Sequence, residues 1–275
     1  MVEDKSTGTF WDHLDALRSV LIRILALLMI ATIVCFCCKD WLFTGIVLAP
    51  QRPDFPTYRL ISYIGALIGV PDTGENFTAI PIINTGMTKQ LFIHVTMSFW
   101  VAILISSPAI IYAIFGFISP ALYREERRLA AGLVGVGWIL FITGVFLSYF
   151  VIFPLAFRFL GTYQVSESVA NYISLESYVD TLIALTLMMG FLFELPVVCW
   201  LLAKLGILTP KFMRKYRKHA LVVILIVAAV ITPTTDIFTL ALVTLPIYML
   251  YELSILVVAR TKINSEKAGE KLLKT

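Results

Sequence analysis

The sequence predicts an all-helical membrane protein that crosses the bilayer six times, with a short last pair of spans and both termini in the cytoplasm. Three observations support this fold class. Hydrophobic residues make up 59% of the 275 residues and charged residues only 15%, whereas soluble proteins carry about 25% charged residues. The apolar residues are grouped in long runs separated by polar segments. Most Lys and Arg residues fall in alternate polar segments.

Residues 1–18 are predicted to form a cytoplasmic amphipathic helix at the membrane surface. Its apolar residues fall on one face at helical spacing, whereas Asp15 and Arg18 lie elsewhere. The first span, at about residues 19–38, follows directly and has the roughly 20 apolar residues that a crossing needs. Carboxylates near the start of the chain and the lack of a small-residue cleavage pattern argue against a cleaved signal peptide.

The second and third spans are predicted within residues 91–122 and 129–157, where ionisable side chains are almost absent. Pro108 is expected to bend the second span. At about 1.5 Å per residue, both runs exceed the roughly 30 Å hydrocarbon core, so their ends should tilt or project.

Two external loops are predicted, at residues 39–90 and 158–180. The first contains five prolines, among them Pro50, which marks an external turn. Its apolar stretch at residues 60–70 is too short to cross the bilayer. We therefore expect that stretch to be either an interfacial segment or part of a small extramembrane cap.

The last three spans are predicted at about residues 181–203, 220–231 and 237–251. The fifth run has only 12 residues, or about 18 Å of helix. It meets the sixth run at a second external turn, which ends with Asp236. We therefore expect the last two spans to be short.

The distribution of positive charge orients the chain. Seventeen of the 22 Lys and Arg residues lie before or early in the first span, between the second and third spans, in residues 204–218, or after residue 258. Because cytoplasmic segments are enriched in Lys and Arg, both termini are placed in the cytoplasm. The membrane domain then covers residues 19–258, and residues 259–275 form a charged cytoplasmic tail that is expected to be disordered.

The sequence gives little support to an enzyme. His13, His94 and His219 lie at three separate span ends, and none stands at metal-binding spacing from Cys, Asp or Glu. Neither a Gly-rich phosphate loop nor a Ser nucleophile elbow occurs. We therefore expect no catalytic residue, no metal, no cofactor and no nucleic-acid partner.

Glu194 lies in the middle of the predicted fourth span, and Pro196 follows two residues later. An ionisable residue at this depth is costly and is a functional candidate, and Pro196 could open the helix beside it. One interpretation is a proton-coupled transporter of a small solute. The other is a neutral, hydrogen-bonded Glu194 that faces other helices. Solute transporters usually have several midplane polar groups and paired interrupted helices, whereas this chain has one carboxylate and no repeat.

Glu125 and Glu126 begin the third span, within a cluster that also holds three arginines. The dipole of a helix favours a carboxylate at its N-terminus, and a carboxylate can bind a guanidinium through two parallel hydrogen bonds. These acids could equally pair with the neighbouring arginines and hold the loop at the membrane surface. The cluster therefore predicts either a docking site for a charged chain or an interfacial anchor.

Several motifs between residues 9 and 258 occur in the order found in one known family. They are the run from His13 to Arg18 (His-Leu-Asp-Ala-Leu-Arg), the run from Phe117 to Arg128 (Phe-Ile-Ser-Pro-Ala-Leu-Tyr-Arg-Glu-Glu-Arg-Arg), the run from Phe153 to Phe157, Phe193-Glu194-Leu195-Pro196, and the run from Gly206 to Pro210. In these motifs the chain resembles TatC, the multispanning subunit of the twin-arginine protein translocase. The run that ends at Arg128 is the most specific of them.

The resemblance implies a receptor in the bacterial inner membrane for folded precursor proteins with an Arg-Arg signal peptide. It assigns the main acid for the two arginines to Glu126, and the expected site further includes Glu125, Asp15, Arg18 and Phe117. The second acid of the family stands where this chain has Ala16. The implied partners are small single-span subunits of the TatA and TatB type and further copies of the chain, with transport driven by the proton-motive force.

Overall fold

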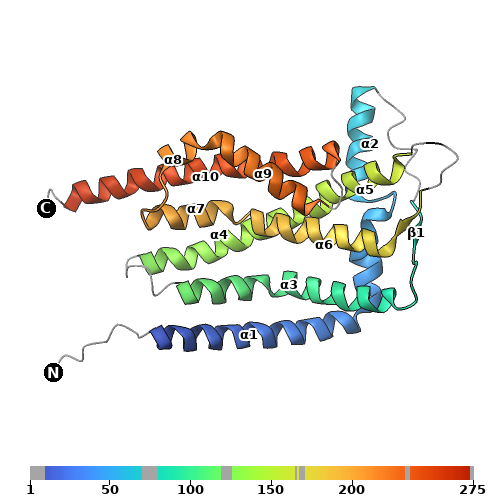
Figure 1. Cartoon of the computed structure of the whole chain (residues 1–275), viewed down its shortest axis with the longest axis horizontal. Coiled ribbons are helices and arrows are strands. Elements are labelled where there is room, and N and C mark those ends of the chain that lie inside the picture. Colours follow the sequence, from blue (N-terminus) through green and yellow to red (C-terminus); the bar gives the residue numbers. More distant parts are fainter. Residues whose placement is uncertain are drawn as a thin grey trace. The chain divides into compact units, whose positions relative to one another are not determined.

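The computed structural model describes residues 10–69, 80–118, 126–164, 166, 171–232 and 236–272 (Figure 1). The described chain is helical almost throughout, which confirms the predicted helical class. It departs from that class in one small sheet, in which strand β1 (Ile82–Ile83) pairs in parallel with strand β2 (Ile173–Ser174). The chain divides into two compact units, Met1–Leu42 with Leu91–Trp138 (unit 1) and Phe43–Gln90 with Ile139–Thr275 (unit 2).

Five helical segments within the described ranges are long and apolar enough to cross a membrane. They are Leu17–Cys37, Lys89–Ile114, Val134–Thr162, Leu175–Lys204 and Ile237–Thr261. The first four overlap the first four predicted spans. Helix α9 (Arg217–Ile231) has only 15 residues, or about 22 Å of helix, which confirms that the fifth apolar run is short.

Unit 1 is built from α1 (Phe10–Cys37), most of α3 (Lys89–Ile118) and the first half of α4 (Glu126–Leu147). α1 is one continuous helix, so residues 10–18, predicted to be an amphipathic surface helix, lead into the first span without a break; residues 1–9 lie outside the described ranges. The helix is continuous because it contains no Pro or Gly that could end it.

The third span is a helical path interrupted by a wider turn in unit 2. α4 ends at Leu147, the π-helical turn η5 covers Ser148–Ile152, and α5 covers Phe153–Thr162. Pro154 explains the interruption, because it has no N–H to bond the carbonyl of Phe150. That carbonyl instead accepts a hydrogen bond from the hydroxyl of Thr57, at the start of helix α2 (Pro56–Ile68).

The segment between the first two spans forms a cap on this turn. It contains η1 (Trp41–Val47), η2 (Ala49–Gln51) and α2 (Pro56–Ile68). Tyrosine hydroxyls attach it to the spans: Tyr149 donates to the carbonyl of Ile46, and Tyr178 donates to the carbonyl of Val47, each at 2.7 Å. Because a buried tyrosine needs a partner for its hydroxyl, these bonds fix the cap while the rings stay packed.

Tyr58 supplies the third such attachment. Its hydroxyl lies 3.1 Å from the carbonyl oxygen of Pro50 and 3.2 Å from that of Pro154. Burial raises the pKa of Tyr58 to about 12, while the nearby guanidinium of Arg158 acts in the opposite direction. The hydroxyl therefore stays protonated at neutral pH and remains a donor.

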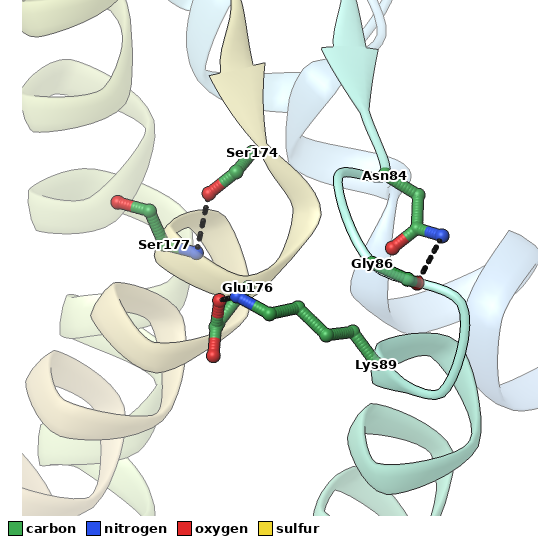
Figure 2. Close-up of polar contacts among 6 residues, drawn as sticks. All are labelled: Asn84, Gly86, Lys89, Ser174, Glu176 and Ser177. Atoms are coloured by element: carbon green, nitrogen blue, oxygen red, sulfur yellow. Dashed lines mark hydrogen bonds and ion pairs between the residues drawn. The ribbon is translucent and has the colours of Figure 1, made fainter.

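A second set of polar contacts joins the strand region to α3 and α6 (Leu175–Leu192), as Figure 2 shows. Lys89, the first residue of α3, forms an ion pair with Glu176 in the first turn of α6. Ser174 caps α6 by accepting the N–H of Ser177 at 3.2 Å. These contacts hold β1 and β2 beside the start of α6.

The expectation that the last span is short is wrong, because the candidate span Ile237–Thr261 has 25 residues within helix α10 (Ile237–Leu272). α10 continues through most of the segment at residues 259–275 that was expected to be disordered; residues 273–275 lie outside the described ranges. Glu252 does not end the helix, because its Oε2 lies 2.7 Å from Nη2 of Arg217 at the start of α9. Two turns further along, Ile255 and Val258 are buried against Met213 of α8 (Pro210–Lys215).

Candidate functional site

The residues expected to bind a signal peptide belong to unit 1. Asp15 and Arg18 are exposed near the beginning of α1, and Phe117 is half-buried one residue before the end of α3. Glu126 is the first residue of α4, whereas Glu125 lies outside the described ranges. These helix ends lie at the same end of unit 1 (Figure 1). The fold therefore brings four of the five predicted residues to one end of a single unit.

The position of Glu126 confirms the expectation that an acid begins this helix. The first four N–H groups of a helix have no partner within it, and they carry the positive end of the helix dipole. The start of this helix therefore favours a negative charge and is suited to an acid that binds a cation. On α1, Asp15 and Arg18 are three residues apart, which is the spacing of neighbours on a helix surface.

Glu194 stands where the fourth span is interrupted. α6 ends at Leu192, and α7 (Leu195–Lys204) begins after a two-residue turn that contains Glu194. Pro196 occupies the first turn of α7, so the helix break expected beside this proline is confirmed. The backbone carbonyl of Glu194 accepts the N–H groups of Val197 and Val198, both at 3.0 Å.

The side chain of Glu194 is half-buried, and its Oε1 atom is buried without a hydrogen-bond partner among the described residues. The hydroxyl oxygens of Ser148 in η5 and Thr186 in α6 are also buried without a hydrogen-bond partner among the described residues. A buried polar atom without a partner costs about 1–3 kcal/mol. These three atoms are therefore suited to bind water or a polar group from another molecule within the spans of unit 2.

Two glycines bring α4 and α6 close together beside these atoms. A methyl group at Gly144 would lie 2.5 Å from the carbonyl oxygen of Met189 and 2.8 Å from the ring of Phe193, and one at Gly190 would lie 2.8 Å from the ring of Phe141. Only glycine permits this approach. The turn that holds Glu194 is thus anchored on α4 through the residue before it.

Pro50 and Asp236, the predicted external turn residues, have structural roles. Pro50 is buried and offers its carbonyl to Tyr58. Asp236 caps α10, since its Oδ1 accepts the N–H of Thr239 at 2.7 Å. Sequence reasoning assigned no role to the hydroxyls of Tyr58, Tyr149 and Tyr178. The available signal was that each phenol lies in or beside an apolar run, where its hydroxyl must find a partner.

Taken together, the long apolar helices define a polytopic helical membrane protein. The family model described as Sec-independent protein translocase protein (TatC) matches residues 12–246. The TatC of Blattabacterium is 34% identical over 257 residues, which cover 93% of this chain and 96% of that protein. The TatC of Escherichia coli K12 is 34% identical over 254 residues, with coverages of 92% and 88%.

A solved structure shows the same relationship. The crystal structure of the twin-arginine translocase receptor TatC superposes with a TM-score of 0.71 at 30% identity, covering 91% of this chain and 99% of that one. The chain belongs to the TatC family. It is a membrane-embedded component of Sec-independent protein translocation and not an enzyme.

Proposed function

We propose that the chain is the receptor for Arg-Arg signal peptides and that Glu126 is the main ligand for the two arginines. The observation that carries this proposal is the position of Glu126 as the first residue of α4. The unpaired backbone N–H groups of a first helical turn favour a negative charge there. A guanidinium forms two parallel hydrogen bonds with a carboxylate, which gives both affinity and orientation.

Asp15 is the second acid of the proposed site, and Phe117 supports the apolar part of the signal peptide. Arg18 stands three residues after Asp15, a spacing at which two side chains are neighbours on a helix surface. Ala16 and Asp15 point about 100° apart on α1. The substitution Ala16→Glu should therefore strengthen signal-peptide binding or leave it unchanged. A clear loss of binding would show that Asp15 and Ala16 do not belong to this site.

The proposal includes a six-span topology with both termini in the cytoplasm of a bacterium. The distribution of Lys and Arg supports this orientation. α9, at about 22 Å, would be the fifth span and would require the bilayer to thin locally. Small single-span subunits of the TatA and TatB type and further copies of the chain would assemble around this receptor, with the proton-motive force driving transport.

A second candidate function is proton-coupled transport of a small solute at Glu194. The buried Oε1 atom of Glu194 favours this function. So do the hydroxyls of Ser148 and Thr186, which are also buried without a hydrogen-bond partner among the described residues. In the receptor, the same atoms would bind a polar group of a partner helix or water. Loss of solute uptake in Glu194→Gln, with signal-peptide binding intact, would favour the transporter.

Photocrosslinking tests the receptor function. A photoreactive amino acid at Phe117 is combined with wild-type Glu126, with Glu126→Gln or with the control Asp54→Asn, which removes an exposed carboxylate from the cap segment. A charged hydrogen-bonded pair contributes about 1.5–3 kcal/mol, so Glu126→Gln should reduce the yield of crosslinks to an Arg-Arg peptide by roughly ten-fold or more. The control should not. Equal yields in all three proteins would reject Glu126 as the ligand.

A further inference from the structure

Helix α2 has an apolar face that the described residues of unit 2 leave exposed. Five large side chains share it, at positions i, i+3, i+4, i+7 and i+8: Leu60, Tyr63, Ile64, Leu67 and Ile68. At 100° per residue these positions fall on one side of the helix. The two most exposed side chains of this face are Leu67 (71% exposed) and Ile68 (73% exposed). Such an apolar stripe on a short helix needs an apolar surface beside it.

The first turn of α2 is fixed to the third span. Thr57 and Tyr58 bond the carbonyls of Phe150 and Pro154, both of which lie inside the candidate span Val134–Thr162. That span has 29 residues, or about 43 Å of helix, against a hydrocarbon core of about 30 Å. With the span centred on residue 148, Pro154 lies about 6 Å and Phe150 about 12 Å inside the edge of the core. α2 therefore begins close to the membrane boundary, on the core side of it.

The direction of α2 fits the same location. Within unit 2, α2 runs across the direction of α6 and α10, which contain two of the candidate spans (Figure 1). A helix that runs across the spans lies along the plane of the membrane. Arg59 is the only residue of α2 that carries a full charge, and it lies off the apolar face with Ala66.

We propose that α2 is an interfacial helix whose apolar face is embedded in the acyl-chain boundary of the leaflet at this end of the spans. Interfacial helices bury their apolar side by about 5–10 Å at the junction of headgroups and acyl chains, which agrees with the depth of Pro154. Tyr63 adds an aromatic ring of the kind enriched at that level. The occupant of this face is lipid, and α2 acts as a lateral support for the cap.

Fluorescence quenching in vesicles tests the assignment. The full-length chain carries a fluorescent amino acid, dansylalanine, at Leu67 or Ile68 on the apolar face, or at Ala66 as the matched control on the adjacent exposed side. It is reconstituted into phosphatidylcholine and phosphatidylglycerol vesicles, with or without bromine on the acyl chains near the headgroups. We expect brominated lipid to quench the probe at 67 and 68 at least roughly two-fold more than at 66, and iodide in the water to quench in the reverse order.

Two outcomes would overturn the proposal. Equal iodide quenching at all three positions, without quenching by brominated lipid, would show that the face is in water. Protection of positions 67 and 68 from both quenchers would show that protein covers the face, and self-quenching between labelled chains would identify a second copy. Two independent positions on the face ensure that a probe that disturbs one of them does not decide the result.

Discussion

The clearest test of the cap is the substitution Tyr58→Phe. It removes one hydroxyl and leaves the carbonyls of Pro50 and Pro154 without their buried donor, while the aromatic ring is kept. A buried polar group that loses its partner costs about 1–3 kcal/mol. We therefore expect the free energy of unfolding at pH 7, measured by denaturant titration in detergent micelles, to fall by that amount.

The pH dependence of this difference sharpens the test. The pKa of Tyr58 is about 12 in the folded protein and about 10 in an unfolded chain. The folded state therefore holds this proton more tightly, so its contribution is complete below pH 10 and is lost as the pH rises toward 12. Phenylalanine has no such proton. The gap between wild type and Tyr58→Phe should close between pH 10 and 12, by about 1.4 kcal/mol for each unit of pKa difference.

Tyr63→Phe is the matched control, because the Tyr63 side chain is exposed on the same helix. Tyr63→Phe should leave the free energy of unfolding unchanged at pH 7 and between pH 10 and 12. Two results would refute the reasoning: equal stability of Tyr58→Phe and wild type at pH 7, or a gap that widens as the pH rises. Taking the difference between variant and wild type cancels the titration of all other groups.

Three further substitutions test the packing and the helix termini by the same unfolding measurement. Gly144→Ala should destabilise the protein by about 1–3 kcal/mol, because the added methyl group meets a backbone carbonyl of α6. In the control Gly135→Ala the methyl group meets nothing within 4 Å, so this variant should be neutral or stabilised by up to about 1 kcal/mol. Equal effects of the two substitutions would contradict the close approach of α4 and α6. Glu176→Gln breaks a half-exposed ion pair, so its cost should stay below about 1 kcal/mol and shrink in high salt; a cost that does not depend on salt would argue against the pair. Asp236→Ala should cost about 1 kcal/mol through loss of the α10 cap, and Asp236→Asn should retain most of it; equal losses in the two variants would reject capping as the cause.

Much of the membrane fold follows from the sequence, because hydropathy and proline positions act locally. The first four spans and the break beside Pro196 were predicted correctly for that reason. The length of α10 was not predicted, because a charged residue such as Glu252 resembles the end of a span. Only its partner Arg217, 35 residues away in the chain, shows that the helix continues.

The candidate site was predictable in part. The position of Glu126 at the start of a helix followed from the change from polar to apolar residues, and the structure confirms it. The attachments of the cap could not be foreseen. Tyr178 bonds a carbonyl 131 residues earlier in the chain, and no local pattern encodes so distant a pairing. Glu125 and its binding role, by contrast, remain predictions.

The tyrosine attachments have a consequence for mutational scans of this protein. Every acceptor in them is a main-chain carbonyl, at positions 46, 47, 50 and 154. A side-chain replacement at position 46 or 47 keeps the main-chain carbonyl. A mutational scan should therefore detect these hydrogen bonds almost entirely through substitutions of the donors Tyr58, Tyr149 and Tyr178. Half of each contact is thereby independent of the amino acid encoded, and the cap can change its side chains at positions 46 and 47 while the bonds from Tyr149 and Tyr178 persist.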